Sequence, residues 1–345
     1  MIDAIINEIE LQKDYLVSES IKTIYFGGGT PSFLNILEIE KILKQIYQVL
    51  NISNNAEITF EANPEDLNIN YLKNLKSVGI NRLSIGIQSF FDEDLKFMNR
   101  RHNAQTAINS VENSQSAGFD NISIDLIYSL PKMNLKKWEN NLQKAFSLNI
   151  QHLSAYQLTI EKGTVFYKYL NEKRIVESTD QQCFEQFETL IEKAEQNGFF
   201  QYELSNFAKP GFESKHNSNY WYQRKYLGIG PSAHSYNFES RQWNISNNSK
   251  YIQSIRKGIV PSEIEILDIY AKYNEFIMTR LRTNKGFELA NLKNEFGEKL
   301  FKHFMKNAKK FEQNDYFEWK NGNCRLNISG LFVSDFIISN LFWIP

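Results

Sequence analysis

A regular alternation of strand-like and helix-like segments through residues 21–158 is the feature that most restricts how this chain can fold. Runs rich in isoleucine and aromatic residues have the composition of strands, at 21–26, 57–62, 82–87, 121–127 and 152–158. These runs are too apolar for a sheet with one face in water. Helical periodicity fills the intervals, at 36–50, 70–79, 104–118 and 135–148. The alternation predicts right-handed βαβ units and a parallel sheet.

The N-terminal segment, residues 1–16, has the pattern of an amphipathic helix placed before the first predicted strand. In a repeating βα architecture each helix packs against the strand that precedes it, so a leading helix indicates a strand ahead of it. We therefore expect an α/β fold with a partial parallel (β/α) barrel that is missing its first strand.

The alternation ends near residue 180. The sequence predicts a long helix over 179–199, a strand over 201–207, an aromatic stretch to about 245 and a second long helix over 263–283. The segments from 286 to 342 include a hairpin-like run at 316–327 and predict a small winged-helix-like α+β domain. We expect three parts: a partial barrel at 1–180, a barrel-completing region at 181–260 and a C-terminal domain at 261–345.

The charge balance and the length of the apolar runs exclude several classes of protein. With 39 basic and 40 acidic residues, the chain has no net field that would attract nucleic acid or an anionic membrane. The apolar runs are strand-sized, shorter than the ~20 residues of a membrane span. The N-terminus does not have the pattern of a signal peptide. We expect a cytoplasmic protein with no nucleic-acid partner and no membrane span, and peripheral association with a membrane is left open.

Polar groups occur at the C-terminal ends of the predicted strands. Three glycines, residues 27–29, follow the first strand, where they let backbone approach a ligand and expose its N–H and C=O groups, although a tight turn would use the same residues. Glu61 lies at the same end of the second strand, Gln88 ends the third, and the fourth contains Asp125. Because active sites of parallel barrels form at this end of the strands, we expect these side chains to converge on one ligand.

The segments FGGGTPSFL, EANPEDL, NRLSIGIQSF, MNRRHN, NISIDLIYSLP and HLSAYQLTIEKGT, in this order, resemble radical S-adenosylmethionine proteins of the oxygen-independent coproporphyrinogen III oxidase and HemW group. The likeness runs over nearly the whole chain. It implies that the chain binds S-adenosylmethionine. The residues that would bind it are Gly28, Gly29 and Thr30 at the amino group, Glu61, Gln88, Arg100 and Asp125 around the carboxylate and ribose, Thr159 beside the adenine, and His234 as a further candidate nearby.

The heptapeptide KHNSNYW, residues 215–221, contains HNxxYW, which resembles the haem-binding signature of the HemW branch and is not expected in the oxidase. By this resemblance His216 would bind haem, together with Tyr220 and Trp221. Neutral imidazole is a common axial ligand of haem iron, and aromatic rings can cover a porphyrin face. Arg224 and Lys225 are candidates for pairing with the haem propionates.

The resemblance also implies a [4Fe–4S] cluster, which this group holds with three cysteines in a CxxxCxxC loop. The chain has only Cys183 and Cys324, whose separation fits no metal or redox spacing, so its sequence holds no ligands for the cluster. In the group the cysteine loop precedes a helix like residues 1–16. We therefore expect that Met1 aligns with an internal position, and a misplaced start codon is favoured over a trimmed or degraded gene.

Two functions from this group remain in competition at this stage. The first is a haem chaperone, which binds haem or a porphyrin and delivers haem to partner proteins. The second is an oxidative decarboxylase of porphyrin biosynthesis that abstracts hydrogen through a 5′-deoxyadenosyl radical. The HNxxYW motif favours the first, and the missing cysteines disfavour the second. A barrel enzyme for phosphorylated metabolites is more distant, because no basic phosphate nest follows the later strands. No catalytic residue is assigned.

Overall fold

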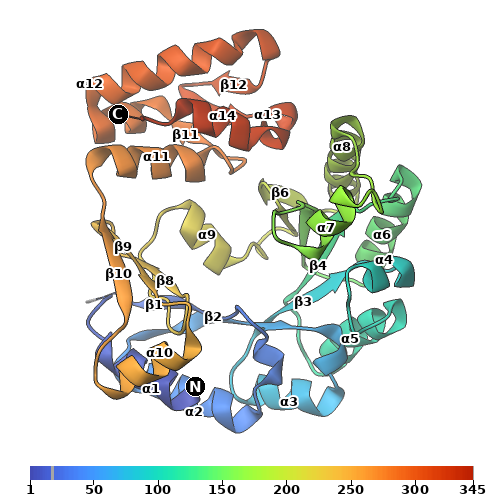
Figure 1. Ribbon diagram of the computed structural model, residues 1–345, viewed down its shortest axis with the longest axis vertical. Coiled ribbons are helices and arrows are strands. Elements are labelled where there is room, and N and C mark those ends of the chain that lie inside the picture. The colour runs from blue at the N-terminus through green and yellow to red at the C-terminus, as the bar shows by residue number, and fades with distance from the viewer. Residues whose placement is uncertain (17–18, 345) are drawn as a thin grey trace. The chain divides into compact units, whose positions relative to one another are not determined.

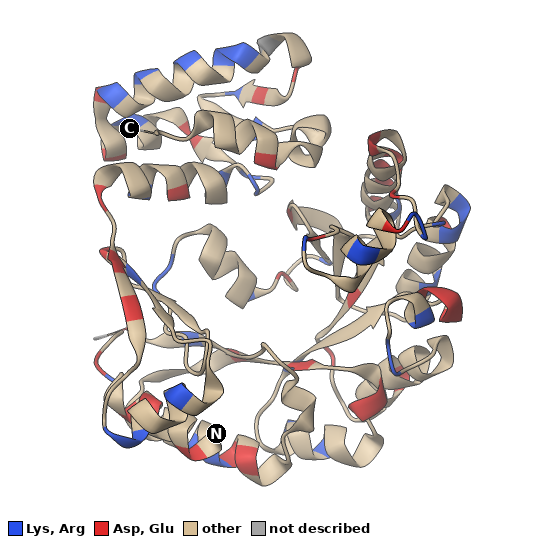
Figure 2. Ribbon diagram, in the orientation of Figure 1, with Lys and Arg blue, Asp and Glu red and all other residues tan. Residues whose placement is uncertain are grey.

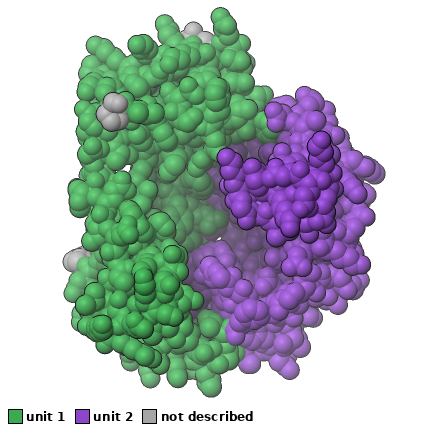
Figure 3. All heavy atoms as spheres, viewed as in Figure 1, with its two compact units in different colours: residues 1–24, 34–57, 215–345 green, residues 25–33, 58–214 purple. Residues whose placement is uncertain are grey.

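The computed structural model describes residues 1–16 and 19–344. The chain forms two compact units, each assembled from segments distant in sequence (Figure 3). Unit 1 consists of residues 1–24, 34–57 and 215–345, and unit 2 of residues 25–33 and 58–214. The division predicted from the sequence, into 1–180, 181–260 and 261–345, consists of continuous segments. It stays a prediction.

A seven-stranded sheet has the order β1-β2-β3-β4-β5-β7-β6 (Figure 1). Its members are β1 (Ile21–Phe26), β2 (Ile52–Ala62), β3 (Arg82–Gln88), β4 (Ile122–Tyr128), β5 (His152–Gln157), β6 (Phe200–Glu203) and β7 (Asn206–Ala208). Strands β2 through β5 pair in parallel, whereas β7 runs antiparallel to both β5 and β6. Consecutive strands from β1 to β5 are neighbours in the sheet, as in a barrel. The predicted α/β fold with a partial parallel barrel is confirmed.

Four helices connect these strands where helical periodicity predicted them: α2 (Ile36–Val49), α3 (Ile69–Ser77), α5 (Ala104–Ser116) and α6 (Leu135–Ser147). Each begins after an asparagine whose side chain accepts a hydrogen bond from the third residue beyond it, namely Asn35, Asn68, Asn103 and Asn134. Asparagine at this position satisfies one of the backbone N–H groups that a helix leaves without a partner. The recurring caps fix where each crossover helix starts.

The central strands are buried on both faces, as their apolar composition predicted. In β3, Leu83, Ile85 and Ile87 are fully buried, and every residue of the strand except Gln88 is buried. Helix α6 contributes the fully buried Trp138 to the core. Burial on both faces is typical of a parallel sheet covered by its own crossover helices.

Unit 2 also contains α4 (Asp92–Phe97), α7 (Val165–Asn171), α8 (Asp180–Gln196) and the short 3₁₀ turns η1 (Pro31–Phe33) and η2 (Pro64–Asp66). The predicted helix over 179–199 is α8, capped by Thr179 in a capping box with Gln182. The single strand predicted over 201–207 is wrong. Strands β6 and β7 form an antiparallel pair there, because the chain reverses at residues 204–205.

In unit 1 the predicted N-terminal helix is α1 (Ile2–Leu11). The unit also contains α9 (Lys215–Trp221), α10 (Asn248–Arg256) and an antiparallel sheet of order β10-β9-β8. The sheet comprises β8 (His234–Tyr236), β9 (Ser240–Asn244) and β10 (Ser262–Ile266). Glu8 of α1 is fully buried. Its carboxylate accepts hydrogen bonds from Gly230 N at 2.7 Å, Asn244 Nδ2 at 2.6 Å and Tyr251 Oη at 2.5 Å. This carboxylate therefore ties α1 to the chain around residue 230.

The helix predicted over 263–283 is wrong in its first part. Residues 262–266 are the strand β10, and α11 (Ile269–Arg280) begins only after Asp268, whose side chain accepts from Ala271 N at 2.7 Å. The glutamate–isoleucine alternation at 263–266 is a strand pattern. Pairing with β9 and the Asp268 cap decide the boundary.

The rest of unit 1 contains β11 (Phe287–Glu288), α12 (Leu289–Ala308), η3 (Lys309–Asn314), β12 (Phe317–Lys320), β13 (Asn323–Leu326), α13 (Ile328–Phe332) and α14 (Ser334–Leu341). The predicted hairpin is β12–β13, within a sheet of order β11-β13-β12. Helix α12 has a break at Gly297, where φ is 79°. In the two described ranges of the chain, no helix combines the length and the apolar character needed to cross a membrane.

Candidate functional site

The register of the parallel strands places polar side chains from four strands next to one another in unit 2. Glu61 of β2 pairs with Ser84 of β3, and Asp125 of β4 pairs with Ser154 of β5. The Ser84 hydroxyl also donates to Asp125 Oδ1 at 3.4 Å. Residues paired across strands project to the same face of a sheet, so these groups form one polar surface on this face.

Two groups from the start of the unit hold the Glu61 carboxylate. Tyr25 Oη donates to Glu61 Oε1 at 2.6 Å, and Gly28 N donates to Glu61 Oε2 at 3.2 Å. A Cβ on Gly27 would lie 2.5 Å from Tyr25 Cε1 and 3.0 Å from Glu61 Cδ, so this position has no space for a side chain. Gly28 and Gly29 have φ of 70° and 59° and are exposed. Their positive φ favours glycine and leaves the backbone open to a ligand.

The side chains of Arg100 and Gln88 both lie close to Gly86. Arg100 Nη2 donates to Asn63 Oδ1 at 2.7 Å and to the carbonyl oxygen of Gly86 at 3.1 Å. A Cβ on Gly86 would lie 2.9 Å from Gln88 Nε2 and 3.4 Å from Arg100 Nη2. Gln88 itself has φ of 68°, a left-handed conformation that non-glycine residues adopt at a cost and often at functional sites. The absence of a side chain at Gly86 thus makes room for both polar groups.

Asp125 is an acid whose ionisation the fold opposes. Burial raises the pKa of its carboxyl to about 6, and the negative charge of Glu61 contributes in the same direction, while hydrogen bonds from Ser154 and Ser84 act against the rise. Burial and Glu61 also raise the pKa of the Tyr25 hydroxyl, which stays protonated as the donor to Glu61. The face therefore offers hydroxyl donors, a carboxylate, a guanidinium, an amide and a carboxyl that can exchange a proton near neutral pH.

The structure brings most of the residues predicted for the nucleotide site into this one cluster. Gly28, Glu61, Gln88, Arg100 and Asp125 are linked by these contacts and by the pairing of their strands. Thr30 precedes the η1 turn at the same end of β1, and Thr159 lies two residues beyond β5. His234 belongs to unit 1, where its ring centre lies 6.3 Å from that of Trp243, and its place in this site stays a prediction.

Sequence reasoning missed the residues that hold the predicted ones in position: Tyr25, Asn63, Ser84 and Ser154. One of these residues could have been found from its spacing in the sequence. Asn63 follows Glu61 by two positions, so an extended chain would place both side chains on the same side. The serines could be found only once the strand register was known.

The cluster suits S-adenosylmethionine, whose amino acid part carries an ammonium and a carboxylate and whose ribose carries hydroxyls. Carboxylates accept hydrogen bonds from ammonium and hydroxyl groups, and a guanidinium pairs with a carboxylate. The chain does not suit a [4Fe–4S] cluster. Cys183 and Cys324 belong to different units, both are buried, and burial raises the pKa of both thiols. Across residues 1–16 and 19–344, no group of three His, Cys, Asp or Glu side chains could hold a metal ion.

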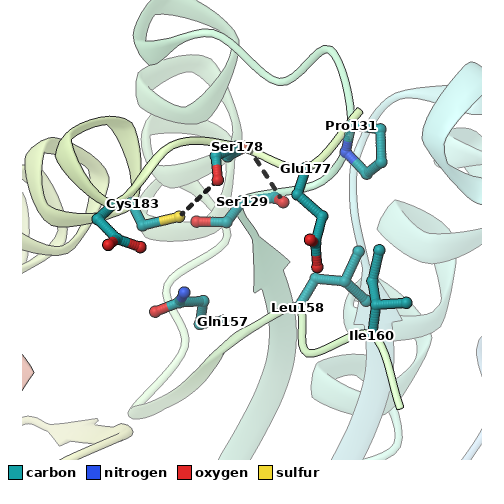
Figure 4. Close-up of a pocket in the computed structure, with 9 residues that line it drawn as sticks. Ser129, Pro131, Gln157, Leu158, Ile160, Glu177, Ser178 and Cys183 are labelled. Carbon is teal, nitrogen blue, oxygen red and sulfur yellow. Dashed lines mark hydrogen bonds between the residues drawn. The ribbon is translucent and has the colours of Figure 1, made fainter. Parts of the chain in front are cut away.

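A small hollow of about 160 Å³ lies in unit 2, and Figure 4 shows its lining. It is bounded by Ser129 after β4, by Gln157 at the end of β5 and by Cys183 of α8. Ligand pockets for drug-sized molecules measure about 300–1,000 Å³, so this hollow is too small for a nucleotide. It contains none of the residues predicted to bind the cofactor.

The HNxxYW motif of unit 1 lies on the short helix α9. Glu57 fixes the start of α9, because its carboxylate accepts hydrogen bonds from His216 N at 3.0 Å and Lys215 N at 3.2 Å. The His216 ring is held at both nitrogens. Nδ1 lies 3.1 Å from Thr23 Oγ1, and Nε2 lies 3.1 Å from Tyr220 Oη. The imidazole is partly buried, whereas the Tyr220 side chain is 39% exposed.

Aromatic rings continue in a row from the histidine. The centre of the Tyr220 ring lies 5.0 Å from that of His216 and 4.7 Å from that of Tyr226, and Tyr236 follows at 6.1 Å from Tyr226. Burial raises the pKa of Tyr220 to about 12, so its hydroxyl is a neutral hydrogen-bonding partner for His216. Trp221 is partly buried at the end of α9. Tyr220 is the exposed ring of this row and Tyr236 is buried, so Tyr220 is the aromatic surface beside His216 on which a porphyrin could pack.

Comparisons with known proteins agree over most of the chain. The radical SAM superfamily pattern matches residues 3–145, and the HemN C-terminal domain pattern matches residues 271–333. The heme chaperone HemW of Bacillus subtilis is 35% identical over 305 residues, which cover 87% of this chain and 80% of that protein. The heme chaperone HemW of Escherichia coli is 33% identical over 279 residues, covering 81% of this chain and 73% of that protein.

Among solved structures, coproporphyrinogen III oxidase (HemN) from Escherichia coli superposes with a TM-score of 0.83 at 20% sequence identity. The superposition covers 99% of this chain and 82% of that one. At this level of identity the likeness establishes a shared fold and nothing about activity.

Proposed function

The chain belongs to the HemW family of radical S-adenosylmethionine proteins, and from this membership we propose that it is a haem chaperone. It would bind haem at the HNxxYW motif in unit 1, with His216 as ligand of the iron, and transfer that haem to proteins that require it. S-adenosylmethionine would bind in unit 2.

The geometry of His216 is the observation that supports this function best. A histidine that ligates iron needs one ring nitrogen facing the metal and a partner at the other nitrogen to fix the orientation of the ring. Thr23 Oγ1 at 3.1 Å from Nδ1 is suited to be that partner. Nε2 lies 3.1 Å from the hydroxyl of the partly exposed Tyr220, so a haem iron could take the place of that hydroxyl.

Binding of S-adenosylmethionine is proposed at the cluster of unit 2. The exposed glycine backbone at residues 28–29 and the carboxylate of Glu61 would hold the ammonium group. Arg100 would pair with the carboxylate of the cofactor, Asp125 and Gln88 would hydrogen-bond the ribose, and Thr159 would lie beside the adenine. The radical SAM family implies this cofactor and a [4Fe–4S] cluster. The two cysteines of this chain, which are buried in different units, do not suit the cluster.

The HNxxYW motif also separates this proposal from the oxidase alternative, which needs neither an axial histidine nor a haem-binding surface. Partner proteins would be those that accept haem, and the aromatic row beside His216 would be the surface from which haem leaves. The three-part division at residues 180 and 260 stays part of the proposal, with the haem motif in the middle part.

Titration of the purified chain with haemin tests the proposed function. The wild type should shift the Soret band with saturable binding, and His216→Ala should abolish the shift. His303→Gln is the matched control, since His303 lies in the C-terminal part of unit 1 and hydrogen-bonds the carbonyl oxygen of Phe342 at 3.1 Å. It should titrate like the wild type. Equal spectra for wild type and His216→Ala would overturn the proposal.

A further inference from the structure

Strand β10 (Ser262–Ile266) forms one edge of the antiparallel sheet in unit 1. The sheet has the order β10-β9-β8, so β10 has a neighbouring strand on one side, and that strand is β9. Residues 263–266 are all exposed, and the exposed fractions of Ile264 and Ile266 are 62% and 75%. An exposed edge strand is a template on which a further strand can pair.

Hydrogen bonds at the two ends of β10 show which of its backbone groups point outward. The carbonyl oxygen of Pro261 and the N–H group of Leu267, which flank β10, each form a hydrogen bond of 2.9 Å with a residue that flanks β9. The ladder hydrogen bonds of an antiparallel strand involve every second residue. The N–H and C=O groups of Ile264 and Ile266 therefore point away from β9, and within residues 1–16 and 19–344 no hydrogen bond to them occurs.

The exposed side chains of β10 form an acidic face and an apolar face. Successive side chains of a strand alternate, so Glu263 and Glu265 share one face and Ile264 and Ile266 share the other. Figure 2 shows acidic residues along this strand. A chain that paired with this edge would therefore have carboxylates beside it on one face and isoleucine side chains on the other.

The carboxylates of this edge are not paired with basic side chains of the chain itself. Arg241 of β9 lies opposite Glu265 in the register, but its guanidinium forms an ion pair with Glu275 of α11. Among the described residues, neither Glu263 nor Glu265 has a basic group within the 4 Å of an ion pair. Opposite charges on neighbouring strands stabilise a sheet, so a strand that carries cations would complement this edge.

The same charges disfavour a second copy of this chain as the occupant. Antiparallel pairing of two copies about a twofold axis at Ile264 would place Glu263 opposite the partner's Glu265. Like charges directly opposite one another destabilise a sheet. The glutamates therefore disfavour pairing between copies and favour a different chain with basic residues.

We propose that β10 is a docking strand for an extended segment of another protein in which basic and apolar side chains alternate. The segment would add to the sheet beyond β10, bond to the outward backbone groups of the strand and cover its two isoleucines. Its lysine or arginine side chains would lie beside Glu263 and Glu265. A haem chaperone needs a surface for its recipients, but this assignment rests on the strand and not on haem binding.

Two fluorescein-labelled hexapeptides provide the test, one with alternating lysine and valine and one with alternating glutamate and valine. Fluorescence anisotropy should show saturable binding of the lysine peptide and no binding of the glutamate peptide. Combining Glu263→Lys with Glu265→Lys should weaken binding of the lysine peptide about tenfold, because attraction becomes repulsion. Glu188→Lys with Glu195→Lys, both exposed on α8, makes the same change of net charge and should bind like the wild type.

The variant Ile264→Pro tests the contribution of the backbone. Proline removes the outward N–H group of residue 264 but no hydrogen bond to β9, so the sheet should remain intact. We expect the lysine peptide to bind about two- to tenfold more weakly. In the wild type, amide hydrogen exchange followed by NMR should slow at Ile264 and Ile266 when the lysine peptide binds, whereas the amides of Glu263 and Glu265 are already protected by β9.

Several results would overturn the proposal. These are no saturable binding of the lysine peptide up to about 1 mM, equal binding of both peptides, or binding that leaves exchange at Ile264 and Ile266 unchanged. Self-association of the wild type that Ile264→Pro abolishes would show that a second copy occupies the edge instead. The haemin titration of Ile264→Pro should match that of the wild type, so failure of the docking proposal and failure of the haem proposal are distinguishable.

Discussion

At Asp125, the raised pKa leads to a prediction about stability and pH. An unfolded aspartate titrates near pH 3.9, whereas the folded pKa is about 6. Between about pH 4 and pH 6 the folded state binds the proton more tightly, so stability falls as pH rises through this window. Asp125→Asn should therefore raise the free energy of unfolding in urea at pH 7.5 by about 1–3 kcal/mol and change it little at pH 4.

An exposed acid of the same unit provides the control. Asp120→Asn should leave unfolding nearly unchanged at both pH values, because its side chain is in water. A stabilisation by Asp125→Asn that was equally large at pH 4 would show that the buried negative charge is not its cause. If Asp125→Asn stabilises the protein only at pH 7.5, the natural aspartate lowers stability at that pH, which is common for a polar group held in place for a ligand.

Gly86 allows the proposed cofactor site to be changed without disrupting the sheet. A methyl group there would meet Gln88 Nε2, the end of a flexible side chain that can rotate away. We expect Gly86→Ala to weaken binding of S-adenosylmethionine about three- to tenfold in calorimetric titration, with the free energy of unfolding changed by less than about 1 kcal/mol. If the effect acts through the displaced amide, Gln88→Ala should weaken binding similarly and the two changes should not add. Full additivity would mean that Gly86 acts by another route.

The residues differ in how far the sequence could predict them. Glu61 and Gln88 follow from the βα periodicity, which alone places them at strand ends, and the same periodicity places Asp125 inside the next strand. Arg100 came only from the resemblance to known proteins, since nothing in its local pattern separates it from a surface arginine. Partners from distant segments, such as Thr23 and Glu57 beside α9, depend on tertiary contacts that no local pattern encodes.

Among the secondary-structure elements, α9 depends on a cap supplied from elsewhere in unit 1. Glu57 is buried, and its carboxylate accepts from the first two backbone N–H groups of the helix. Glu57→Ala would leave these donors without a partner, which costs about 0.5–2 kcal/mol for a helix cap. We expect haemin affinity to fall about two- to thirtyfold, since the helix positions His216.

The measurement is again a Soret titration, and it separates positioning from ligation. With Glu57→Ala the Soret position at saturation should match the wild type, since His216, the proposed iron ligand, is still present. Glu57→Gln, which keeps one acceptor oxygen, should bind with intermediate affinity. An unchanged affinity in both variants would show that α9 does not need this cap.

The sequence predicted the regular elements well where one period dominates. Strand β1 and helices α2, α3, α5 and α6 lie within a few residues of their expected ranges, because apolar periodicity and asparagine caps agree there, whereas the short helix α4 was not predicted. The failures lie where a short strand adjoins a helix or a turn. Residues 263–266 were included in the predicted helix although their glutamate–isoleucine alternation is a strand pattern, and pairing with β9 decides their state. The turn between β6 and β7 was missed because strands of four and three residues are too short to display a period, and pairing with β5 decides their state.

At the scale of the whole molecule, the two cysteines lead to a prediction about iron. Anaerobic reconstitution with iron and sulfide should yield no [4Fe–4S] cluster on this polypeptide, because such a cluster needs clustered cysteine thiolates and these two thiols are buried in separate units. Iron and acid-labile sulfide per chain should match those of a Cys183→Ser, Cys324→Ser variant. A full complement of both elements that disappears in the variant would refute the expectation.

The burial of both thiols also makes the chain suited to fluorescent labelling. Since only thiolates react quickly with maleimides, Cys183 and Cys324 should not react in the native protein. A cysteine introduced at an exposed position should react with the dye. A dye on exposed Lys250 of α10, introduced as Lys250→Cys, would leave the HNxxYW helix untouched. Haem absorbs across much of the visible spectrum, so its arrival would quench that dye and its departure to an acceptor protein would restore the emission, which would allow the transfer to be timed.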